Sequence, residues 1–405
     1  MSELYELPDG WEWKKLEDIF LIQRGGSPRP IKDYITNDED GINWIKIGDT
    51  KKGKKYITQT AQKIKPEGMK KSRLVVEGDF LMSNSMSFGR PYIVKIKGAI
   101  HDGWLLMREK LDNTDKDFFY YLLSSNYMYR QFSSKASGTT VKNLNINLVK
   151  LTDIPLPPFN EQKRIVSKLD NLFEKIDKSI ALHQKNMDEA DLFIGSVLND
   201  VFVELEEKYG LTSLSTVVKI NSGIALPKIF KNIEFSNGEL EFFKVAQMNN
   251  DNKVMKKANL NFTLSQSKEL KIKLFPKGSI LIPKRGGAIL TNKKRIMERE
   301  ASYDSNIMGL KANNNILSDE FLFIFLNSID LSNYIDATTI PQVNNKHIDM
   351  MNISIPPLPI QQQIVKYLDK ISEKTEKLKS IQKEKMDNLI SLKTSILDKA
   401  FRGEL

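Results

Sequence analysis

The sequence predicts an α+β fold in which two mixed α/β modules alternate with two long helices. Three observations support this prediction: an internal repeat of about half the chain, short β-like runs in the longer part of each repeat, and apolar residues at steps of three and four in the shorter part. The chain has 405 residues, of which 40% are hydrophobic and 9% aromatic, so it can form real cores. At roughly 100–200 residues per domain, this length corresponds to two to four domains.

The internal repeat is clearest where residues 153–170, DIPLPPFNEQKRIVSKLD, align with residues 352–369, NISIPPLPIQQQIVKYLD. The offset between these segments is 199 residues. Upstream the similarity is weaker but keeps its order, as in residues 78–81 (GDFL) and 278–281 (GSIL). An ordered series of matches of this kind indicates that the chain arose by duplication.

The longer part of each repeat has the pattern of a mixed α/β module. Short apolar runs such as 74–76 and 92–94 predict strands, and Gly, Asn and Asp residues separate them. Helical patterns interrupt these runs at 117–126 and 319–327. Each module should therefore contain short strands and a few helices.

The shorter part of each repeat predicts a long helix with one narrow apolar seam. No Pro or Gly interrupts residues 161–194 or 360–402, and the residues outside the seam are charged. A helix of about 44 residues is about 66 Å long and is not stable unpaired in water. The helix of the other copy is the obvious partner, and antiparallel pairing would place the modules at opposite ends with pseudo-two-fold symmetry, whereas parallel pairing would crowd them. The predicted parts are residues 1–158, 159–208, 209–357 and 358–405.

The charge balance favours a polyanionic partner. Lys and Arg number 61 and Asp and Glu 51, giving a net charge of +10, which suits nucleic acid or an anionic surface. A soluble protein of basic average composition is the alternative. The sequence has no run of 18 apolar residues, which a membrane span would need. Residues 1–6 lack the basic start and apolar run of a signal peptide. We therefore expect a cytoplasmic protein without a membrane partner.

The sequence offers no catalytic or metal-binding pattern. It has no Cys, which excludes disulfides, cysteine-ligated zinc, iron–sulfur clusters and a thiol nucleophile, and its three His are far apart. The segment 156–159 (LPPF) is similar to an amino-methyltransferase motif, but Leu156 cannot hydrogen-bond a target amino group. Asp9 and Glu12 are too close together beside Gly10 to match a nuclease site, whose carboxylates come from different strands.

Two similar basic modules at a fixed separation suit a DNA site made of two different halves. The candidate DNA contacts are polar and basic side chains in loops, because such side chains bind phosphates and base edges. In the first module they are Arg24, Lys51, Lys54, Lys71, Arg73, Ser83, Asn84, Ser85, Ser87, Arg90, Thr139 and Lys142. In the second they are Lys284, Arg285, Asn292, Lys293, Lys294, Arg295, Gln342, Asn344 and Lys346. Solvated polar turns are the alternative for these loops.

The whole chain resembles the specificity subunit of type I restriction–modification systems. The resemblance rests on motifs that are weak singly and specific as an ordered, repeated series. They are residues 7–13 (LPDGWEW), 78–81 (GDFL), 154–158 (IPLPP) with 161–162 (EQ) and 165–166 (IV), the second copies at 355–357 (IPP), Gln361 and 364–365 (IV), and 400–405 (AFRGEL). Ile360 departs from the pattern, since it aligns with Glu161 and weakens the charge at the start of the second helix.

The resemblance implies that each module is a target recognition domain that reads one half of a split, asymmetric site in double-stranded DNA. It also implies that the helices set the unread spacer and dock two modification subunits, which carry S-adenosylmethionine and methylate adenine, and that a translocating restriction subunit joins them. The chain itself would be non-catalytic, with no cofactor and no metal. Two alternatives are an enzyme with its own methyltransferase or nuclease site and a helical scaffold whose modules bind proteins; DNA binding that weakens steeply with salt would exclude the scaffold.

Overall fold

The chain folds into two units, each of which contains one module and parts of both long helices. Unit 1 comprises Met1–Gln184 and Lys383–Leu405, and unit 2 comprises Lys185–Gln382. The computed structural model describes residues 5–50, 53–84, 89–112, 114–134, 144, 146–230, 238–250, 253–336 and 340–405. We describe each unit by itself.

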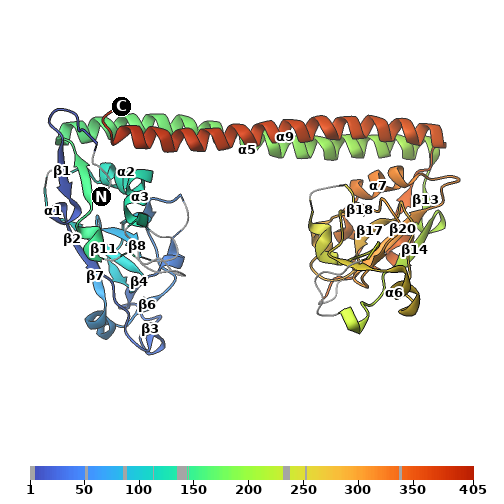
Figure 1. The fold of residues 1–405 in the computed structure, drawn as a ribbon, viewed down its shortest axis with the longest axis horizontal. Coiled ribbons are helices and arrows are strands. Elements are labelled where there is room, and N and C mark those ends of the chain that lie inside the picture. The colour runs from blue at the N-terminus through green and yellow to red at the C-terminus, as the bar shows by residue number, and fades with distance from the viewer. Residues whose placement is uncertain are drawn as a thin grey trace. The chain divides into compact units, whose positions relative to one another are not determined.

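Two five-stranded sheets form the centre of unit 1 (Figure 1). The first has the order β2 (Phe20–Arg24), β11 (Trp104–Glu109), β8 (Phe80–Ser83), β9 (Pro91–Val94) and β5 (Tyr56–Ile57). The second has the order β3 (Ile35–Thr36), β6 (Lys63–Ile64), β4 (Ile42–Ile45), β10 (Gly98–Ile100) and β7 (Arg73–Val75). A separate pair joins β1 (Glu12–Lys15) to β12 (Asp153–Leu156). Strands β8, β9 and β10 are buried throughout, which explains their continuous apolar runs.

The helices of the unit 1 module pack on the first sheet in one core. They are α1 (Leu16–Ile19), α2 (Lys116–Ser124), α3 (Asn126–Ser134) and α4 (Ile146–Lys150). Helices α2 and α3 lie on the side of the sheet toward the long helices (Figure 1). Asp115 caps the start of helix α2, because its carboxylate accepts hydrogen bonds from the N–H groups of Asp117 and Phe118 at 2.9 and 3.0 Å. The helix buries its apolar face, including Phe118, against the sheet and the long helices.

Unit 2 repeats this arrangement with fewer strands. Its sheets have the orders β14 (Val218–Ser222), β20 (Ile307–Ala312), β17 (Ile280–Pro283) and β18 (Arg295–Ile296), and β16 (Leu260–Phe262), β15 (Leu240–Phe243) and β19 (Ser302–Tyr303). The pair β13 (Thr212–Ser213) and β21 (Asn352–Ile353) corresponds to β1 and β12. Its helices are α6 (Leu264–Glu269), α7 (Asp319–Ser328) and α8 (Asn345–Asp349).

One buried glutamine in each unit links the long helix to the module. In unit 1 the side-chain amide of Gln162 donates to the carbonyl of Pro157 at 2.9 Å and accepts from the N–H of Asp115, at the start of α2, at 2.9 Å. In unit 2 Gln361 makes the same two bonds, to the carbonyl of Pro356 at 2.8 Å and from the N–H of Ser318, at the start of α7, at 2.9 Å. These matching bonds align the two repeats. Gln361 follows Gln162 by 199 residues, which is the offset along the long helices, and Ser318 follows Asp115 by 203 residues, which is the offset between α7 and α2.

The long helices α5 (Phe159–Tyr209) and α9 (Leu358–Ala400) pair in antiparallel orientation. In unit 1 the ammonium group of Lys393 lies 2.8 Å from a carboxylate oxygen of Asp177, and in unit 2 that of Lys379 lies 2.7 Å from Asp191. Within unit 1, Arg164 also donates to the carbonyl of Leu405 at 2.7 Å, so the step forward from Arg164 to Asp177 along α5 is matched by the step back from Leu405 to Lys393 along the C-terminal segment. Helix α5 continues past the predicted uninterrupted stretch, through Gly195, to Tyr209.

No helix in the described part of the chain is both long enough and apolar enough to cross a bilayer.

Candidate nucleic-acid interface

A basic groove with a volume of about 1250 Å³ opens on the module of unit 1, and we call it the unit 1 groove. Five segments of the module line it: Arg24, Ser27–Lys32 and Ile35, then Trp44–Gly48 apart from Ile45, then Gln62, Asn84 and His101–Gly103. Four of these side chains are cationic: Arg24, Arg29, Lys32 and Lys46. Among its described lining residues Asp102 is the one acid, so the groove suits an anionic ligand.

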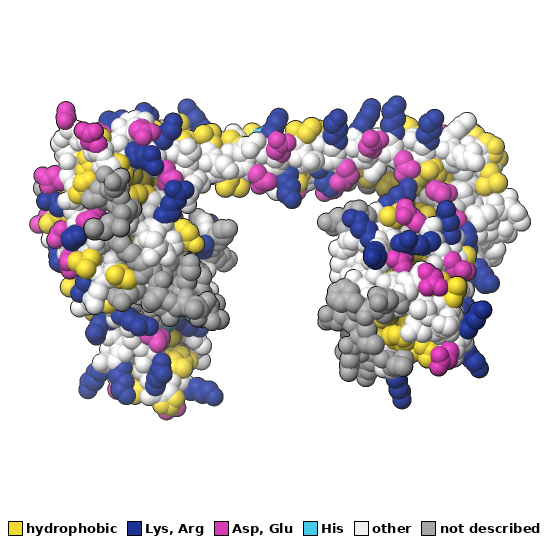
Figure 2. All heavy atoms as spheres, viewed as in Figure 1, with side chains coloured by type: hydrophobic (Ala, Val, Ile, Leu, Met, Phe, Trp, Pro, Cys, Tyr) yellow, Lys and Arg dark blue, Asp and Glu magenta, His cyan; other side chains and the backbone are white. Residues whose placement is uncertain are grey.

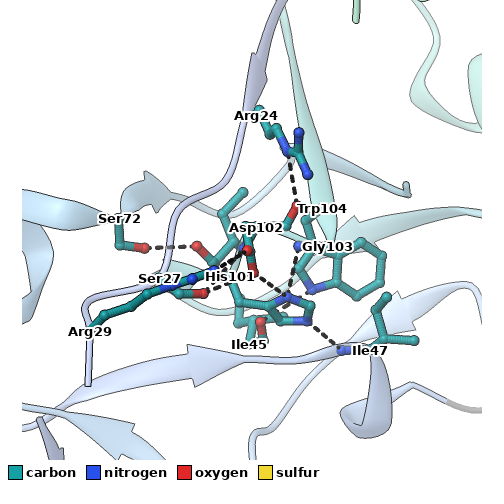
Figure 3. A network of polar contacts seen from close by, with 11 residues as sticks. Arg24, Ser27, Arg29, Ile45, Ile47, Ser72, His101, Asp102, Gly103 and Trp104 are labelled. Carbon is teal, nitrogen blue, oxygen red and sulfur yellow. Dashed lines mark hydrogen bonds and ion pairs between the residues drawn. The ribbon is translucent and has the colours of Figure 1, made fainter. Parts of the chain in front are cut away.

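The turn His101–Gly103 organises this groove (Figure 3). Asp102 accepts hydrogen bonds from the Ser27 hydroxyl at 3.0 Å and from the Arg29 guanidinium at 3.4 Å. The backbone carbonyl of Asp102 accepts from Nε of Arg24 at 3.2 Å. A side chain at position 25 would place its Cβ 2.1 Å from the carbonyl oxygen of His101, so only glycine permits this close approach. The turn thus positions two arginines at the groove.

The His101 ring faces backbone donors from two directions (Figure 3). The N–H of Ile47 lies 3.2 Å from Nε2, and the N–H of Gly103 lies 2.8 Å from Nδ1. A neutral imidazole offers one acceptor nitrogen and a protonated one offers none. Burial lowers the pKa of His101, and the charge of Lys46 acts in the same direction, although Asp102 opposes both. The folded groove therefore favours the neutral ring.

Unit 2 has a carboxylate in the place of this histidine. Asp304 accepts from the N–H of Val245 at 3.0 Å and from the N–H of Asn306 at 2.7 Å. These two N–H groups correspond to those of Ile47 and Gly103 in unit 1. A carboxylate satisfies both donors, whereas a histidine cannot.

Acidification is expected to destabilise unit 1 through His101. Because its pKa in the folded protein lies below the ordinary value of 6.5, the stabilisation from the neutral ring is complete above pH 6.5. It is lost as the pH falls toward the lower pKa of the folded state. We expect the melting temperature to fall more steeply between pH 7.5 and 5.5 in the wild type than in His101→Asp, which copies Asp304. The test is the sign of this difference in slope, and parallel curves would contradict the prediction.

In unit 2 the structure brings together two loops that the sequence marked as DNA-contacting. The N–H of Gly286 donates to the carbonyl of Pro341 at 2.8 Å, and the N–H of Val343 donates to that of Lys284 at 3.0 Å. Nη2 of Arg285 lies 3.5 Å from Oε1 of Gln342. Lys284, Arg285 and Gln342 thus form one polar cluster, which we call the unit 2 loop cluster.

Asn84 occupies the corresponding place in unit 1. The N–H of Leu144 donates to its carbonyl at 3.2 Å, as the N–H of Val343 does to that of Lys284. Asn84 is buried, and its Oδ1 has no hydrogen-bond partner among the described residues. The same position in the fold therefore holds a buried amide in unit 1 and a partly exposed ammonium group, followed by an exposed guanidinium, in unit 2.

The structure corrects the expectation that Lys294 contacts DNA. Lys294 is 1% exposed, and its ammonium group donates to Oδ1 of Asn292 at 2.6 Å and to the carbonyl of Ile329 at 2.8 Å. Burial lowers the pKa of Lys294 to about 8. Oδ1 of Asn292 also accepts from the N–H of Leu331 at 2.9 Å, so both residues join two loops of unit 2 instead of facing a ligand.

Three other predicted side chains also serve the fold. The buried Ser83 hydroxyl accepts from the N–H of Arg90 at 3.1 Å and closes a turn. Arg295 donates to Oδ1 of Asn250 at 3.1 Å. Lys346 pairs with Asp336 at 2.7 Å. Ser83 is thus unavailable as a surface contact, whereas Arg295 and Lys346 remain partly or fully exposed.

Of the remaining predicted residues, Arg24 and Asn84 line the unit 1 groove. The structure brings Lys54, Lys71, Arg73, Arg90 and Lys293 into neither site. Asn344 starts α8 and donates to Asp336 at 3.4 Å. On the visible face of each unit, basic and acidic side chains are interspersed (Figure 2). Lys51, Ser85, Ser87, Thr139 and Lys142 lie outside the described residues.

Sequence reasoning missed most of the unit 1 groove, namely Ser27, Arg29, Lys32, Lys46, His101 and Asp102. The segment 24–32, RGGSPRPIK, carried a usable signal, because it combines turn residues with three cations. Within the described ranges, no group of three or more His, Asp or Glu could hold a metal ion.

Comparison with known proteins agrees with these features. The family model described as "Type I restriction modification DNA specificity domain" matches residues 8–186 and again 206–385. The MjaIX specificity subunit of a type I restriction enzyme from Methanocaldococcus jannaschii is 24% identical, covering 100% of this chain and 95% of that protein. The EcoKI specificity subunit of Escherichia coli K12 is 22% identical over 99% of this chain and 90% of that protein.

Solved structures share the fold. A chain from a study of complex assembly and conformational transition of the type I restriction–modification system has a TM-score of 0.76 at 22% identity, covering 99% of this chain and 100% of that one. The HsdS subunit from Thermoanaerobacter tengcongensis has a TM-score of 0.58 at 23% identity, covering 99% of each chain. The predicted α+β fold class is confirmed.

Proposed function

Because this chain belongs to the family of type I restriction–modification DNA specificity subunits, we propose that its two recognition domains read the two different halves of an asymmetric, bipartite DNA site. The observation that carries the proposal is the position shared by Asn84 and Lys284. The two units build the same backbone frame there, but unit 2 places the partly exposed Lys284 and the exposed Arg285 on it, whereas unit 1 buries Asn84 and supplies its cations from the groove. Cations placed differently on a common frame meet different base edges, so the half-sites should differ.

The unit 1 groove supports contact with DNA in the first half-site. Four cations line it, and Asp102 holds Arg29 at its rim without neutralising the groove. Cations of this kind bind phosphates, and an arginine can pair with guanine. In unit 2, Lys284 and Arg285 supply the corresponding charges from the loop cluster.

We further propose that this chain is not itself an enzyme and that S-adenosylmethionine is bound by its modification partners. Purified alone, the chain should transfer no methyl group to DNA and cut none. Reconstituted with its modification subunit, it should direct adenine methylation to one bipartite sequence, which methylation mapping would reveal. DNA binding should weaken steeply with salt: the logarithm of the association constant should fall with the logarithm of the salt concentration, with a slope of about −0.9 for each phosphate contacted. Methyl transfer by the lone chain, or binding insensitive to salt, would refute the proposal.

We propose that two modification subunits dock on the long helices, where each unit exposes apolar side chains at equivalent positions. Unit 1 exposes Leu182 by 60% and Leu392 by 48%, and unit 2 exposes Ile381 by 41% and Phe193 by 54%. Each residue of one pair lies 199 positions from its equivalent in the other. Exposed apolar side chains mark a protein interface when they gather into a patch, and the recurrence of this pair in both units is what supports two equivalent docking sites. A restriction subunit would join through the modification subunits.

Charging one of these pairs should remove one docking site. In Leu182→Lys with Leu392→Lys, burying two ammonium groups would disfavour the interface of unit 1, so native mass spectrometry should show one bound modification subunit in place of two. The control is Asn171→Lys with Ser391→Lys, which adds the same charges to exposed polar positions of the same helices. Two subunits bound to the charged variant at wild-type affinity would place the docking surface elsewhere.

A further inference from the structure

Unit 2 has a cleft of about 690 Å³ between α7 and the paired segments of α5 and α9, which we call the α7 cleft. Its floor is apolar and consists of the buried side chains of Phe323, Ile324 and Leu368. Ion pairs lie around it, with Lys253 at 2.9 Å from Asp369 and Lys379 at 3.2 Å from Glu376. A small, exposed residue, Ser372, lines one side.

Unit 1 fills the corresponding place with its own aromatic side chains. The bonds of Gln162 and Gln361 align Phe173 with Ser372 and Tyr121 with Ile324. Phe173 is only 6% exposed, and its ring centroid lies 5.5 Å from that of Tyr121. The ammonium group of Lys393 lies 4.7 Å from the Phe173 ring centre.

The polar partners of these rings are kept in unit 2, although the rings themselves are replaced. In unit 1 the Tyr121 hydroxyl donates to Asp170, and Lys55 lies 5.4 Å from the Tyr121 ring. The equivalent acid is Asp369 and the equivalent cation is Lys253. Unit 2 therefore retains an acceptor for a hydroxyl, Asp369, and a cation, Lys253, whose ammonium group lies 5.5 Å from the Phe323 ring at the apolar floor.

We propose that an aromatic side chain of a modification subunit, with tyrosine-like chemistry, inserts into the α7 cleft. The inference rests on the docking proposed above, because the cleft is built on the same two helices that carry the exposed pair of unit 2. Ile194 and Val197 line it from α5, and Ile371 and Lys379 line it from α9. An aromatic anchor in a pocket, with a cation over its face, is a strong contributor to an interface. The two modification subunits are then held unequally, with an anchor in unit 2 and none in unit 1.

A matched set of variants of the full chain tests this inference. Ser372→Phe places the unit 1 residue in unit 2 and should fill the cleft, whereas Ser372→Ala should leave it open. We expect Ser372→Phe to weaken one of the two binding steps of the modification subunit at least tenfold in calorimetric titration, with the other step unchanged and Ser372→Ala like the wild type. Melting temperatures would verify that both variants fold.

A direct probe separates this inference from the docking proposal. p-Cresol carries the side chain of tyrosine, and we expect saturation-transfer NMR to detect its binding to the wild type and to Ser372→Ala but not to Ser372→Phe. Equal p-cresol signals in all three chains would overturn the cleft as an aromatic site, even if no modification subunit bound. If Ser372→Phe lost the p-cresol signal but bound both modification subunits with wild-type affinity, the cleft would be an aromatic site that no side chain of the modification subunit occupies.

Discussion

Replacing Lys284 and Arg285 together by alanine should abolish discrimination at one half of the DNA site and leave the other half intact. Both side chains belong to the unit 2 loop cluster, and neither contributes to the core of that unit. Each lost base contact costs about 1–3 kcal/mol. Two such contacts correspond to at least a ~30-fold loss of affinity for the correct second half-site.

The matched variant in unit 1 is Arg24→Ala with Arg29→Ala. Both arginines are exposed at the unit 1 groove, so this variant should impair only the first half-site. Competition binding against DNA altered in one half at a time measures the two effects separately. If both double variants lost affinity equally for every sequence, these residues would hold phosphates and read no bases.

The second large effect concerns the gap between the half-sites. We expect insertion of four residues after both Asn186 and Lys385, which are equivalent positions of the repeat, to preserve the half-site sequences and lengthen the gap. Four residues add about 6 Å of helix, and DNA rises about 3.4 Å per base pair, so the gap should grow by one or two base pairs. Four residues also nearly preserve a seam with 3.5-residue spacing.

Two inserted residues serve as the contrasting variant. They rotate the apolar face by about 200°, so the Asp177–Lys393 and Asp191–Lys379 pairs could no longer form together with the seam. This variant should lose stability and site-specific methylation. Methylation mapping of the reconstituted complexes measures the gap, and an unchanged gap after the four-residue insertion would show that the helices do not set the spacing.

The long helices were predictable because their signal is local. Steps of three and four between apolar residues define a seam, and a helix of that length needs a partner. The residues of the unit 2 loop cluster were also identified from the sequence, since Lys284 and Arg285 follow a buried strand and Gln342 lies in a loop near the end of the same module. Their meeting was not, because Arg285 and Gln342 are 57 positions apart.

The unit 1 groove was not predictable, because sheet pairing assembles it from distant segments. Ser27 and Asp102 are 75 positions apart in sequence and meet only after β2 and β11 have paired. The burial of Lys294 was hidden for the same reason. The carbonyl that accepts its hydrogen bond, at Ile329, is 35 positions away. A local run of cations does not indicate which of them a distant loop will bury.

The bonds of Gln162 and Gln361 have an evolutionary consequence. Among the described residues, the hydrogen bonds of each glutamine side chain to the recognition domain all go to main-chain N–H and carbonyl groups. Every amino acid except proline supplies both groups, so the attachment of the domain to the long helix is insensitive to the side chains that the domain carries. A recognition domain can therefore accumulate substitutions in its loops, and acquire a new DNA preference, while its junction with the helix stays the same. Selection for new specificity and selection for assembly act on separate parts of this chain.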